Sequence, residues 1–305
     1  MPQLLMSNLK LFIKKLISTA FVKTILSIPF LRWVLSRTPI QFQMACLFGF
    51  TTPQKITIEI DDFTFPIYSS SKDDHFQKAF LGTIHKWEPE SFSVWKALCA
   101  NSETVLDVGA YLGIYSIVSV LAGTKQVVAY EPNRHAFHSL KENLKLNDIA
   151  DRVISREVAL SSVVGVANMI VPLNRNLSSG ARLKSSETGI DFPHWENLDL
   201  VEIIPLDLDL QNMGIEKVDA IKIDVEGAEL KVLQGAVNLI STQRPPIIIE
   251  LLDYSTYLQV CSFLQSTGYG QPTPLDGISI ALSNPGCRRS IATNYFFAKN
   301  SPEIA

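Results

Sequence analysis

Two groups of residues in this chain have the types and the spacing for chemistry. The first reads D-x-G-x-x-x-G from Asp107, with Gly109 and Gly113 as its glycines, and Glu131 follows 22 residues after Gly109. Glycines permit a tight turn with positive φ and a close approach of the backbone to a ligand. A carboxylate about 20 residues after such a turn can accept hydrogen bonds from both hydroxyls of a ribose. The pattern therefore predicts a site for an adenosine-containing cofactor.

The glycine spacing distinguishes between cofactor classes. A dinucleotide loop reads G-x-G-x-x-G, and its middle glycine makes room for a pyrophosphate, whereas this chain has Tyr111 in the central position. Asp107 would crowd a diphosphate, but it can pair with an ammonium through charge-assisted hydrogen bonds. We therefore expect the positively charged cofactor S-adenosylmethionine, and a nicotinamide-dependent oxidoreductase is the rival enzyme. The structural alternative for Asp107 is a cap on the turn that follows it.

A second group of carboxylates follows another apolar run. The segment IKIDVEGAEL places Asp224, Glu226 and Glu229 within six residues, and Glu250 ends the next apolar run. If the two runs are neighbouring strands, Asp224 and Glu250 face the same cleft, where they could bind Mg²⁺ or take a proton from a substrate hydroxyl. The structural alternative for Asp224 is a helix cap, and Glu229 is expected at an exposed or paired position on the helix. For Lys222 we expect an ion pair with one of these acids.

Strands that alternate with helices must place both groups at one edge of a sheet. We expect strands, from their apolar runs, at Thr104–Val108, Gln126–Tyr130, Val153–Ala159, Val218–Ile223, Pro246–Leu251 and Ala292–Ala298. We expect helices at Glu90–Ala100, Gly113–Ala122, Asn133–Asn147, Gly227–Ser241 and Ser255–Ser266. This alternation predicts an α/β fold with an open sheet. Residues Ser161 to Glu202 interrupt it, and we interpret them as a substrate-side insertion or flap.

The N-terminal part differs from the rest in charge. No acidic residue precedes Glu59, so the first 58 residues carry +7 and, of the total of −3, the remainder carries −10. Residues 4–37 have the pattern of a basic amphipathic helix, and lysines interrupt it too often for a membrane span. Three roles stay open for this helix: contact with an anionic membrane surface, packing on the main domain or a second subunit, or targeting.

We expect a helical extension at residues 1–52 and a main domain at 53–305, with a β-hairpin lead-in at 53–86 and the core at 87–299. The acidic main domain argues against binding to nucleic acid. Four widely spaced cysteines without a C-x-x-C pair are typical of thiols in a reducing compartment. These features predict a cytoplasmic protein, with possible peripheral contact with a membrane.

The motifs VLDVGAYLGIYS, YEP, IKIDVEGAELKVLQGA and PIIIE, in this order, resemble the FkbM family of S-adenosylmethionine-dependent methyltransferases, and DVEGAE is the most distinctive of them. The resemblance covers about Trp87 to Lys299. It implies a Rossmann-like, seven-stranded, mostly parallel sheet with helices on both faces, and transfer of a methyl group, usually to a hydroxyl. The cofactor residues that it implies are Asp107, Gly109, Ala110, Gly113 and Glu131, while Asp224 would border the transfer site. Tyr111 occupies a position where family members commonly have Asn.

We therefore expect an O-methyltransferase whose acceptor is a hydroxyl of a sugar, a lipid headgroup or a secondary metabolite. Asp224 is the expected base, assisted by Glu250 or by Mg²⁺ bound to these two residues, and Glu226 is a further catalytic candidate. Since methyl transfer is an in-line displacement, alignment of the reactants supplies much of the rate. The rival from another class is a catalytically inactive, membrane-associated binding protein of the same fold, which would have lost the ribose carboxylate or blocked the loop.

Overall fold

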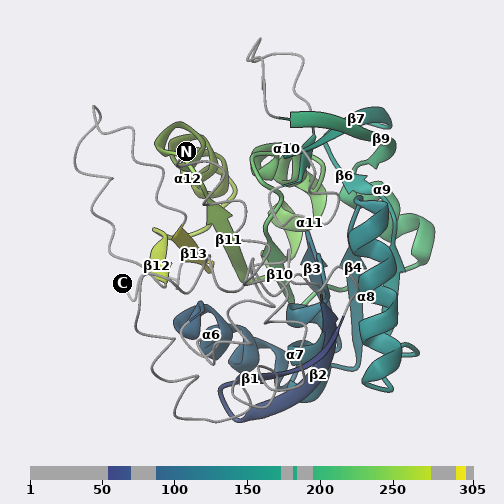
Figure 1. Cartoon of the computed structure of the whole chain (residues 1–305). Helices are drawn as coiled ribbons and strands as arrows, with labels where there is room; N and C mark the ends of the chain where they lie inside the picture. The colour runs from purple at the N-terminus through teal and green to yellow at the C-terminus, as the bar shows by residue number, and fades with distance from the viewer. Residues whose placement is uncertain (1–53, 70–86, 173–180, 184–194, 276–292, 300–305) are drawn as a thin grey trace, which may run out of the picture. The chain divides into compact units, whose positions relative to one another are not determined.

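The structure is a computed structural model that describes residues 54–69, 87–172, 181–183, 195–275 and 293–299 (Figure 1). The chain divides into two compact units, Met1–Trp87 and Glu88–Ala305. The helical extension predicted for residues 1–52 lies outside the described residues. Within the described part of the chain, no helix is long and apolar enough to cross a membrane.

The described part of the first unit is an antiparallel hairpin of β1 (Gln54–Ile60) and β2 (Phe63–Ser69). A two-residue turn, Asp61 and Asp62, joins the strands. Asp61 has a φ of 54°, in the left-handed region that such tight hairpin turns require and that Asp tolerates better than most residues.

The second unit is built on a seven-stranded sheet in the order β12-β13-β11-β10-β3-β4-β5. Its strands are β3 (Thr104–Val108), β4 (Gln126–Tyr130), β5 (Val153–Arg156), β10 (Ala220–Ile223), β11 (Ile247–Leu251), β12 (Thr273–Leu275) and β13 (Thr293–Phe297). Neighbouring strands are parallel, except that β13 is antiparallel to both β11 and β12. The expected α/β fold with a mostly parallel, seven-stranded sheet is thus confirmed.

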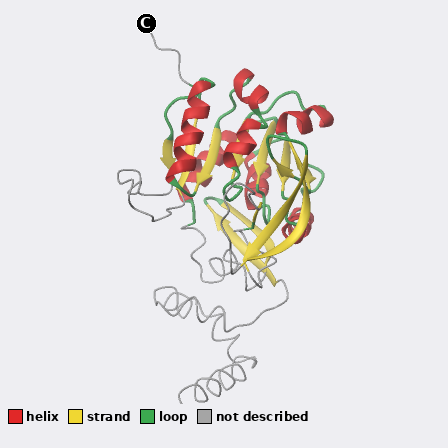
Figure 2. Ribbon diagram, turned by 90° about the horizontal axis from the view of Figure 1, so that it is seen from above, coloured by secondary structure: helices red, strands yellow, loops and turns green. Residues whose placement is uncertain are grey.

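Helices cover both faces of this sheet (Figure 1, Figure 2). They are α6 (Pro89–Cys99), α7 (Ile114–Ala122), α8 (Arg134–Leu146), α9 (Leu206–Met213), α10 (Glu229–Gln234), α11 (Val237–Thr242) and α12 (Tyr254–Ser266). Side chains alternate between the faces of a strand, so Leu106 and Ile221 join the core under α9 to α12. Their neighbours Asp107 and Lys222 point to the opposite face, where the Lys222 ammonium lies over the ring of Tyr115 on α7.

The structure corrects two of the expected elements. The helix expected at Gly227–Ser241 is divided into α10 and α11, and Gly235 lies at the break. A Cβ at Gly235 would lie 2.0 Å from the carbonyl oxygen of Ser161, so the close approach of another segment accompanies the break. The strand expected at Val153–Ala159 ends at Arg156, and Ala159 begins β6 (Ala159–Leu160), which belongs to a different sheet.

The described part of the predicted insertion forms this second sheet, in the order β6-β9-β7-β8. β7 (Gly165–Pro172) pairs with β9 (Trp195–Ile204) and with β8 (Arg182–Leu183), in both cases antiparallel. Residues 173–180 and 184–194 of the insertion lie outside the described residues. The short strand β8 is the part of the insertion that reaches the carboxylates of the main sheet, through Arg182.

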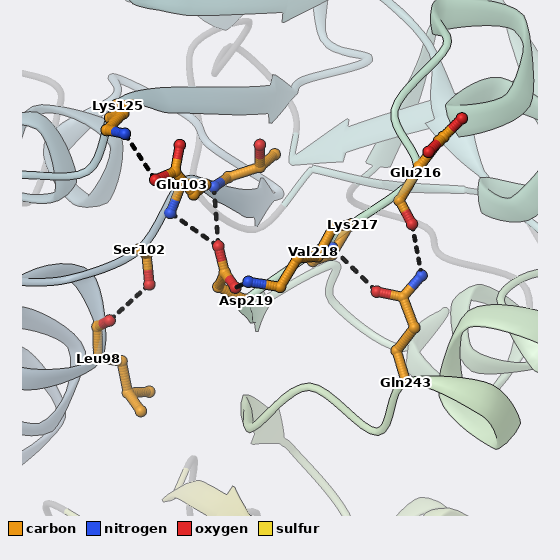
Figure 3. Close-up of polar contacts among 10 residues, drawn as sticks. Leu98, Ser102, Glu103, Lys125, Glu216, Lys217, Val218, Asp219 and Gln243 are labelled. Carbon is orange, nitrogen blue, oxygen red and sulfur yellow. Dashed lines mark hydrogen bonds and ion pairs between the residues drawn. The ribbon is translucent and has the colours of Figure 1, made fainter.

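The amino ends of β3 and β10 are joined by a polar network (Figure 3). One carboxylate oxygen of Asp219 accepts hydrogen bonds from the backbone N–H groups of Glu103 and Thr104, at 2.7 and 3.0 Å. Gln243 accepts from the N–H of Val218 and donates to the carbonyl of Glu216. These bonds hold β10 against β3 at the strand ends opposite to the predicted site.

Candidate functional site

The register of the parallel strands brings the two predicted groups of carboxylates together. Asp107 on β3 is the Cα partner of Lys222 on β10. The pairing of β10 with β11 continues toward Asp224 and Glu250, which follow the last paired residues. One carboxylate oxygen each of Asp224, Glu226 and Glu250 lies within 4.8 Å of the other two. The condition for a shared cleft, that β10 and β11 are neighbours, is therefore met.

The glycine loop contacts the second motif directly. Gly109 has a φ of +86°, and a Cβ at this position would lie 1.7 Å from the carbonyl oxygen of Asp224. Gly113 has a φ of +84°, and its Cβ would meet the side chain of Leu140 on α8 at 2.5 Å. The protein's own packing thus requires Gly109, whereas at Gly113 the positive φ is the stronger constraint, because the end of a leucine side chain can shift. Tyr111, between them, has a φ of 50°, a left-handed conformation that Gly and Asn adopt more readily.

The N–H groups of the loop are largely used within the protein. Gly109 and Ala110 both donate to the carbonyl of Tyr130 at 2.9 Å. The N–H of Tyr111 donates to the Glu131 carboxylate at 2.8 Å. A loop that binds a pyrophosphate must present its N–H groups to the ligand. The arrangement therefore disfavours a dinucleotide, in agreement with the glycine spacing.

Two buried carboxylates flank this loop. Asp107 is 1% exposed and accepts a hydrogen bond from the Ser116 hydroxyl, in the first turn of α7, at 2.6 Å. Glu131 is 6% exposed, and besides Tyr111 it accepts the N–H of Asn133 at 2.8 Å. Burial raises the pKa of Asp107 to about 6 and that of Glu131 to about 7. The Ser116 bond gives Asp107 a structural role in addition to any contact with a ligand.

A buried lysine lies among these acids. The Nζ atom of Lys222, a residue only 1% exposed, is 3.4 Å from Oδ2 of Asp224, so the expected ion pair is present. The same atom lies 4.9 Å from the ring centroid of Tyr115, whose hydroxyl donates to Glu88 at 2.6 Å. Burial alone would lower the pKa of Lys222, but the surrounding carboxylates, with Asp224 foremost, raise it above its ordinary value. Lys222 therefore carries a full positive charge at neutral pH.

Asp224 affects the pKa values of its neighbours Glu226 and Glu250. Burial, and then the negative charge of Asp224, raise the pKa of Glu226 to about 7 and that of Glu250 well above its usual range. Glu226 has a φ of 55° and lies 3.5 Å from Nη2 of Arg182 on β8. The insertion thus contacts the turn that follows β10. The name acidic edge is used below for Asp107, Glu131, Asp224, Glu226 and Glu250.

The structural alternative for Asp224 is wrong. Asp224 does not cap α10, because this helix begins at Glu229 and Ala228 occupies its N-cap position. Of the two positions expected for Glu229, exposed or paired, the structure has the second: Glu229 is 1% exposed and accepts the N–H of Gly227 at 2.8 Å. The side chain of Glu229, the first residue of α10, instead bonds the turn between Asp224 and this helix.

Sequence reasoning missed Asn294. It lies on β13 as the Cα partner of Glu250, it is 3% exposed, and its Oδ1 atom has no hydrogen-bond partner among the described residues. Directly paired residues of antiparallel strands share a face of the sheet, so Asn294 lies beside the acidic edge. The sequence contains one signal for this role: Asn294 is an amide directly before the apolar run from Tyr295 to Ala298, within the strand expected at Ala292–Ala298.

Because of its buried carboxylates, we expect the ligand-free protein to become less stable as the pH rises. Asp107, Glu131, Glu226 and Glu229 have pKa values of about 6 to 7 in the folded state, above their ordinary values. The folded state therefore binds more protons than the unfolded state, and the stabilisation is lost as the pH rises through these values. We expect the free energy of unfolding to fall by about 2 kcal/mol or more between about pH 5.5 and about pH 8.

Urea unfolding at constant ionic strength, followed by tryptophan fluorescence, measures this fall. Glu131→Gln removes one of the buried carboxylates whose pKa is raised, so its slope of stability against pH should be smaller than that of the wild type. A free energy of unfolding that rises over this range would contradict the prediction.

The strand order, the glycine loop after β3 and the acidic edge at the carboxyl ends define a Rossmann-like α/β protein of the methyltransferase type. Residues 107–270 match the Methyltransferase FkbM domain. The match covers more than half of the 305 residues, and the chain belongs to the FkbM methyltransferase family.

Individual relatives share parts of the chain. Methyltransferase sdnD of Sordaria araneosa is 28% identical in an alignment 153 residues long that covers 43% of this chain and 59% of that protein. A ribosomal protein L11 methyltransferase of Citrifermentans bemidjiense is 37% identical over 67 residues, 22% of each protein. The crystal structure of methyltransferase FkbM from Methylobacillus flagellatus KT has a TM-score of 0.42 at 20% identity, covering 72% of this chain and 54% of that one. The chain thus spans less than two thirds of each of these proteins.

Proposed function

We propose that this protein is an S-adenosylmethionine-dependent methyltransferase that methylates a hydroxyl oxygen. One observation carries the proposal: the acidic edge adjoins, through Asp107, Glu131 and Asp224, a loop whose N–H groups are largely bonded within the protein, and Glu226 and Glu250 lie beside Asp224. Such an edge suits a cationic cofactor with hydroxyl donors and disfavours a phosphate. Two facts argue against the inactive binding protein: the chain belongs to a methyltransferase family, and the carboxylate expected to bind the ribose is present as Glu131.

The donors and acceptors present fit this cofactor. Glu131 is held by two backbone N–H groups, and the second lone pairs of its oxygens can accept the two hydroxyls of a ribose. Asp107 can accept an ammonium at the amino-acid end of the cofactor, directly or through water. Gly109, Ala110 and Gly113 shape the loop between them. S-adenosylmethionine supplies an electrophilic methyl group on its sulfonium when it is bound.

The residues on the other side of the edge prepare the acceptor. Asp224 follows the last residue of β10 beside the loop, and its carboxylate lies 3.4 Å from the Lys222 ammonium, which orients it as the group that accepts the proton of a hydroxyl. Burial and the charge of Asp224 raise the pKa of Glu250, which favours its protonated form, and in that form it can donate a hydrogen bond to Asp224 or to the acceptor. Glu226, held near Arg182, is the further candidate in this role. The free Oδ1 of Asn294 suits a second hydrogen-bond donor on the acceptor.

The acceptor that we propose is a hydroxyl of a sugar, a lipid headgroup or a secondary metabolite. A neutral hydroxyl compound suits the acidic edge better than an anionic one. The cations Arg182 and Lys222 already pair there with Glu226 and Asp224, respectively. Asp224, Glu226 and Glu250 also have the spacing for Mg²⁺, which is the alternative partner of the base. Contact of residues 4–37 with an anionic membrane, and a cytoplasmic location, remain predictions.

Titration calorimetry tests the cofactor. We expect S-adenosylmethionine and S-adenosylhomocysteine to bind and NAD not to bind. Glu131→Gln should weaken both cofactors by about tenfold to a hundredfold, because a hydrogen bond to a charged group contributes about 1.5 to 3 kcal/mol. Glu103→Gln is the matched control, since Glu103 pairs with Lys125 at the surface near the amino end of β3 (Figure 3). Tight binding of NAD alone would overturn the proposal.

A further inference from the structure

The position of Lys222 is unusual for a lysine. Its side chain is almost completely buried, and it extends from the centre of the main sheet toward the acidic edge. A buried ammonium costs free energy unless acids surround it closely. Here Asp107 is its neighbour on β3, Asp224 lies at 3.4 Å, and the charges of Glu88 and Glu250 also act on it. Acids from β3, from β11, from the turn after β10 and from the residue before α6 thus surround one ammonium.

The same acids offer the oxygens that a divalent cation would need. The carboxylates of Asp224, Glu226 and Glu250 approach one another closely enough to bind one ion. Asp224 is common to this group and to the ion pair with Lys222. An ion bound to Asp224 would therefore be close to the ammonium, and two positive charges at such a separation repel each other strongly in a buried site. The ammonium and a metal ion compete for the same carboxylate.

We propose that the ammonium of Lys222 is the resident cation of the acidic edge, where it positions the carboxylate of Asp224 in place of a divalent metal ion. Lys222 is a positioning residue, because it acts through Asp224. Its Nζ atom lies over the ring of Tyr115, and the hydroxyl of this ring donates to Glu88, so the ammonium has a defined place. This inference rests on the proposed function in one respect, the role of Asp224 as the base.

The proposal predicts that loss of the charge opens a metal site. Lys222→Met keeps most of the side chain's volume and removes its charge, so the three carboxylates lose their internal cation. We expect Lys222→Met to bind Tb³⁺ at least about tenfold more tightly than the wild type, because the repulsion by the ammonium is gone. Tyr115 and Trp95, which are in edge contact, lie near enough to the site to sensitise the luminescence of the ion.

Three further variants identify the cause of the binding. Lys222→Met combined with Asp224→Asn should lose the gained affinity, which assigns the ion to the acidic edge. Lys222→Arg keeps the charge and should bind Tb³⁺ as weakly as the wild type. Lys217→Met makes the same chemical change at an exposed lysine that pairs with Asp219 at the opposite end of β10, and it should resemble the wild type (Figure 3). Equal affinity of Lys222→Arg and Lys222→Met would show that the positive charge does not exclude the ion, and would overturn the proposal.

Turnover of the wild type and of Lys222→Met tests the proposal by a second measurement. We expect the turnover of the wild type, measured with labelled S-adenosylmethionine and a cell extract, to be unchanged after dialysis against a chelator. In Lys222→Met turnover should fall, and added Mg²⁺ should restore a part of it, a rescue that a purely structural role would not produce. A chelator-sensitive wild type that binds Tb³⁺ through Asp224 would overturn the proposal even if Lys222→Met does not fold.

Calorimetry with S-adenosylhomocysteine on the same proteins separates this inference from the proposed function. If the wild type fails to bind this compound, the proposed function fails, while the Tb³⁺ affinities still decide whether Lys222 excludes a metal ion. If the compound binds and the wild type also binds Tb³⁺ as tightly as Lys222→Met, the proposed function stands and the role of Lys222 is wrong.

Discussion

Asp224→Asn is expected to lower turnover about a thousandfold and to change the affinity for S-adenosylhomocysteine no more than several-fold, since a positioned base contributes about 10² to 10⁴ in rate. The amide has nearly the same shape as the carboxylate but cannot accept the proton of a hydroxyl. The backbone of Asp224 stays bonded to β3, because its N–H donates to the carbonyl of Val108 at 2.9 Å. The loop that binds the cofactor should therefore persist.

The matched control is Asp253→Asn. Asp253 caps α12 by accepting the N–H of Thr256 at 3.0 Å, and Asn is an equally good cap, so this variant should keep wild-type turnover and stability. Transfer of label from S-adenosylmethionine to a component of a cell extract measures turnover, and identification of the labelled product gives the acceptor. A fully active Asp224→Asn would exclude Asp224 as the base, and an equal loss in Asp253→Asn would point to a general effect of the substitution.

Asp224→Asn also removes the carboxylate that pairs with Lys222. An amide cannot compensate the buried ammonium, so Asp224→Asn should also lower the free energy of unfolding, whereas loss of the base alone would not. Comparison of the rate and the stability in this one variant separates the two roles of Asp224. The rate effect belongs to the proposed reaction, and the stability effect belongs to the ion pair.

Much of the fold was predictable because the main strands are continuous apolar runs covered on both faces. Thr104–Val108 and Gln126–Tyr130 begin and end in the structure where the sequence placed them, with flanking polar residues and glycine turns marking their ends. The expected meeting of Asp224 and Glu250 depended on which strands are neighbours, and periodicity does not contain that information. The register of β10 against β3 and β11 supplies it.

The features that sequence reasoning missed depend on contacts between distant segments. Gly235 separates α10 from α11 where the backbone of Ser161 approaches it, and neither segment carries a signal for the other. Glu229 has the position of a helix surface residue, but it is buried against the turn that precedes its own helix. Asn294 becomes notable through its pairing with Glu250, because it lies on the antiparallel strand β13. In each case burial by a remote segment outweighs the local pattern.

The glycine loop after β3 packs against the backbone of Asp224, and this contact is the reason for the large effect expected of Gly109→Ala. Gly109 was predicted to allow the approach of a ligand, and the structure adds that the carbonyl of Asp224 already occupies the space next to its Cα. The N–H of Gly109 donates to Tyr130 on β4, while the N–H of Asp224 donates to Val108 on β3. Neither backbone can move away from the other without breaking the pairing of the central strands.

Gly109→Ala is therefore expected to lower the free energy of unfolding by about 4 kcal/mol or more, a loss that single substitutions reach only through severe strain or packing defects. The left-handed φ of +86° contributes about 1 to 2 kcal/mol of this loss. The rest comes from the Cβ, which would lie 1.7 Å from the carbonyl oxygen and 2.8 Å from the carbonyl carbon of Asp224. Because the clash separates the loop from Asp224, binding of S-adenosylhomocysteine should weaken as well.

Gly214→Ala isolates the contribution of the backbone conformation. Gly214 ends α9 with a φ of +69°, and a Cβ there would meet no atom within 4 Å. Its substitution should cost about 1 to 2 kcal/mol, the penalty of the left-handed conformation alone, and should leave the affinity for S-adenosylhomocysteine unchanged. Urea unfolding of the two variants at one pH measures the difference. Equal losses would mean that the Asp224 carbonyl yields to the added methyl group, and the packing of the two motifs against each other would then not account for Gly109.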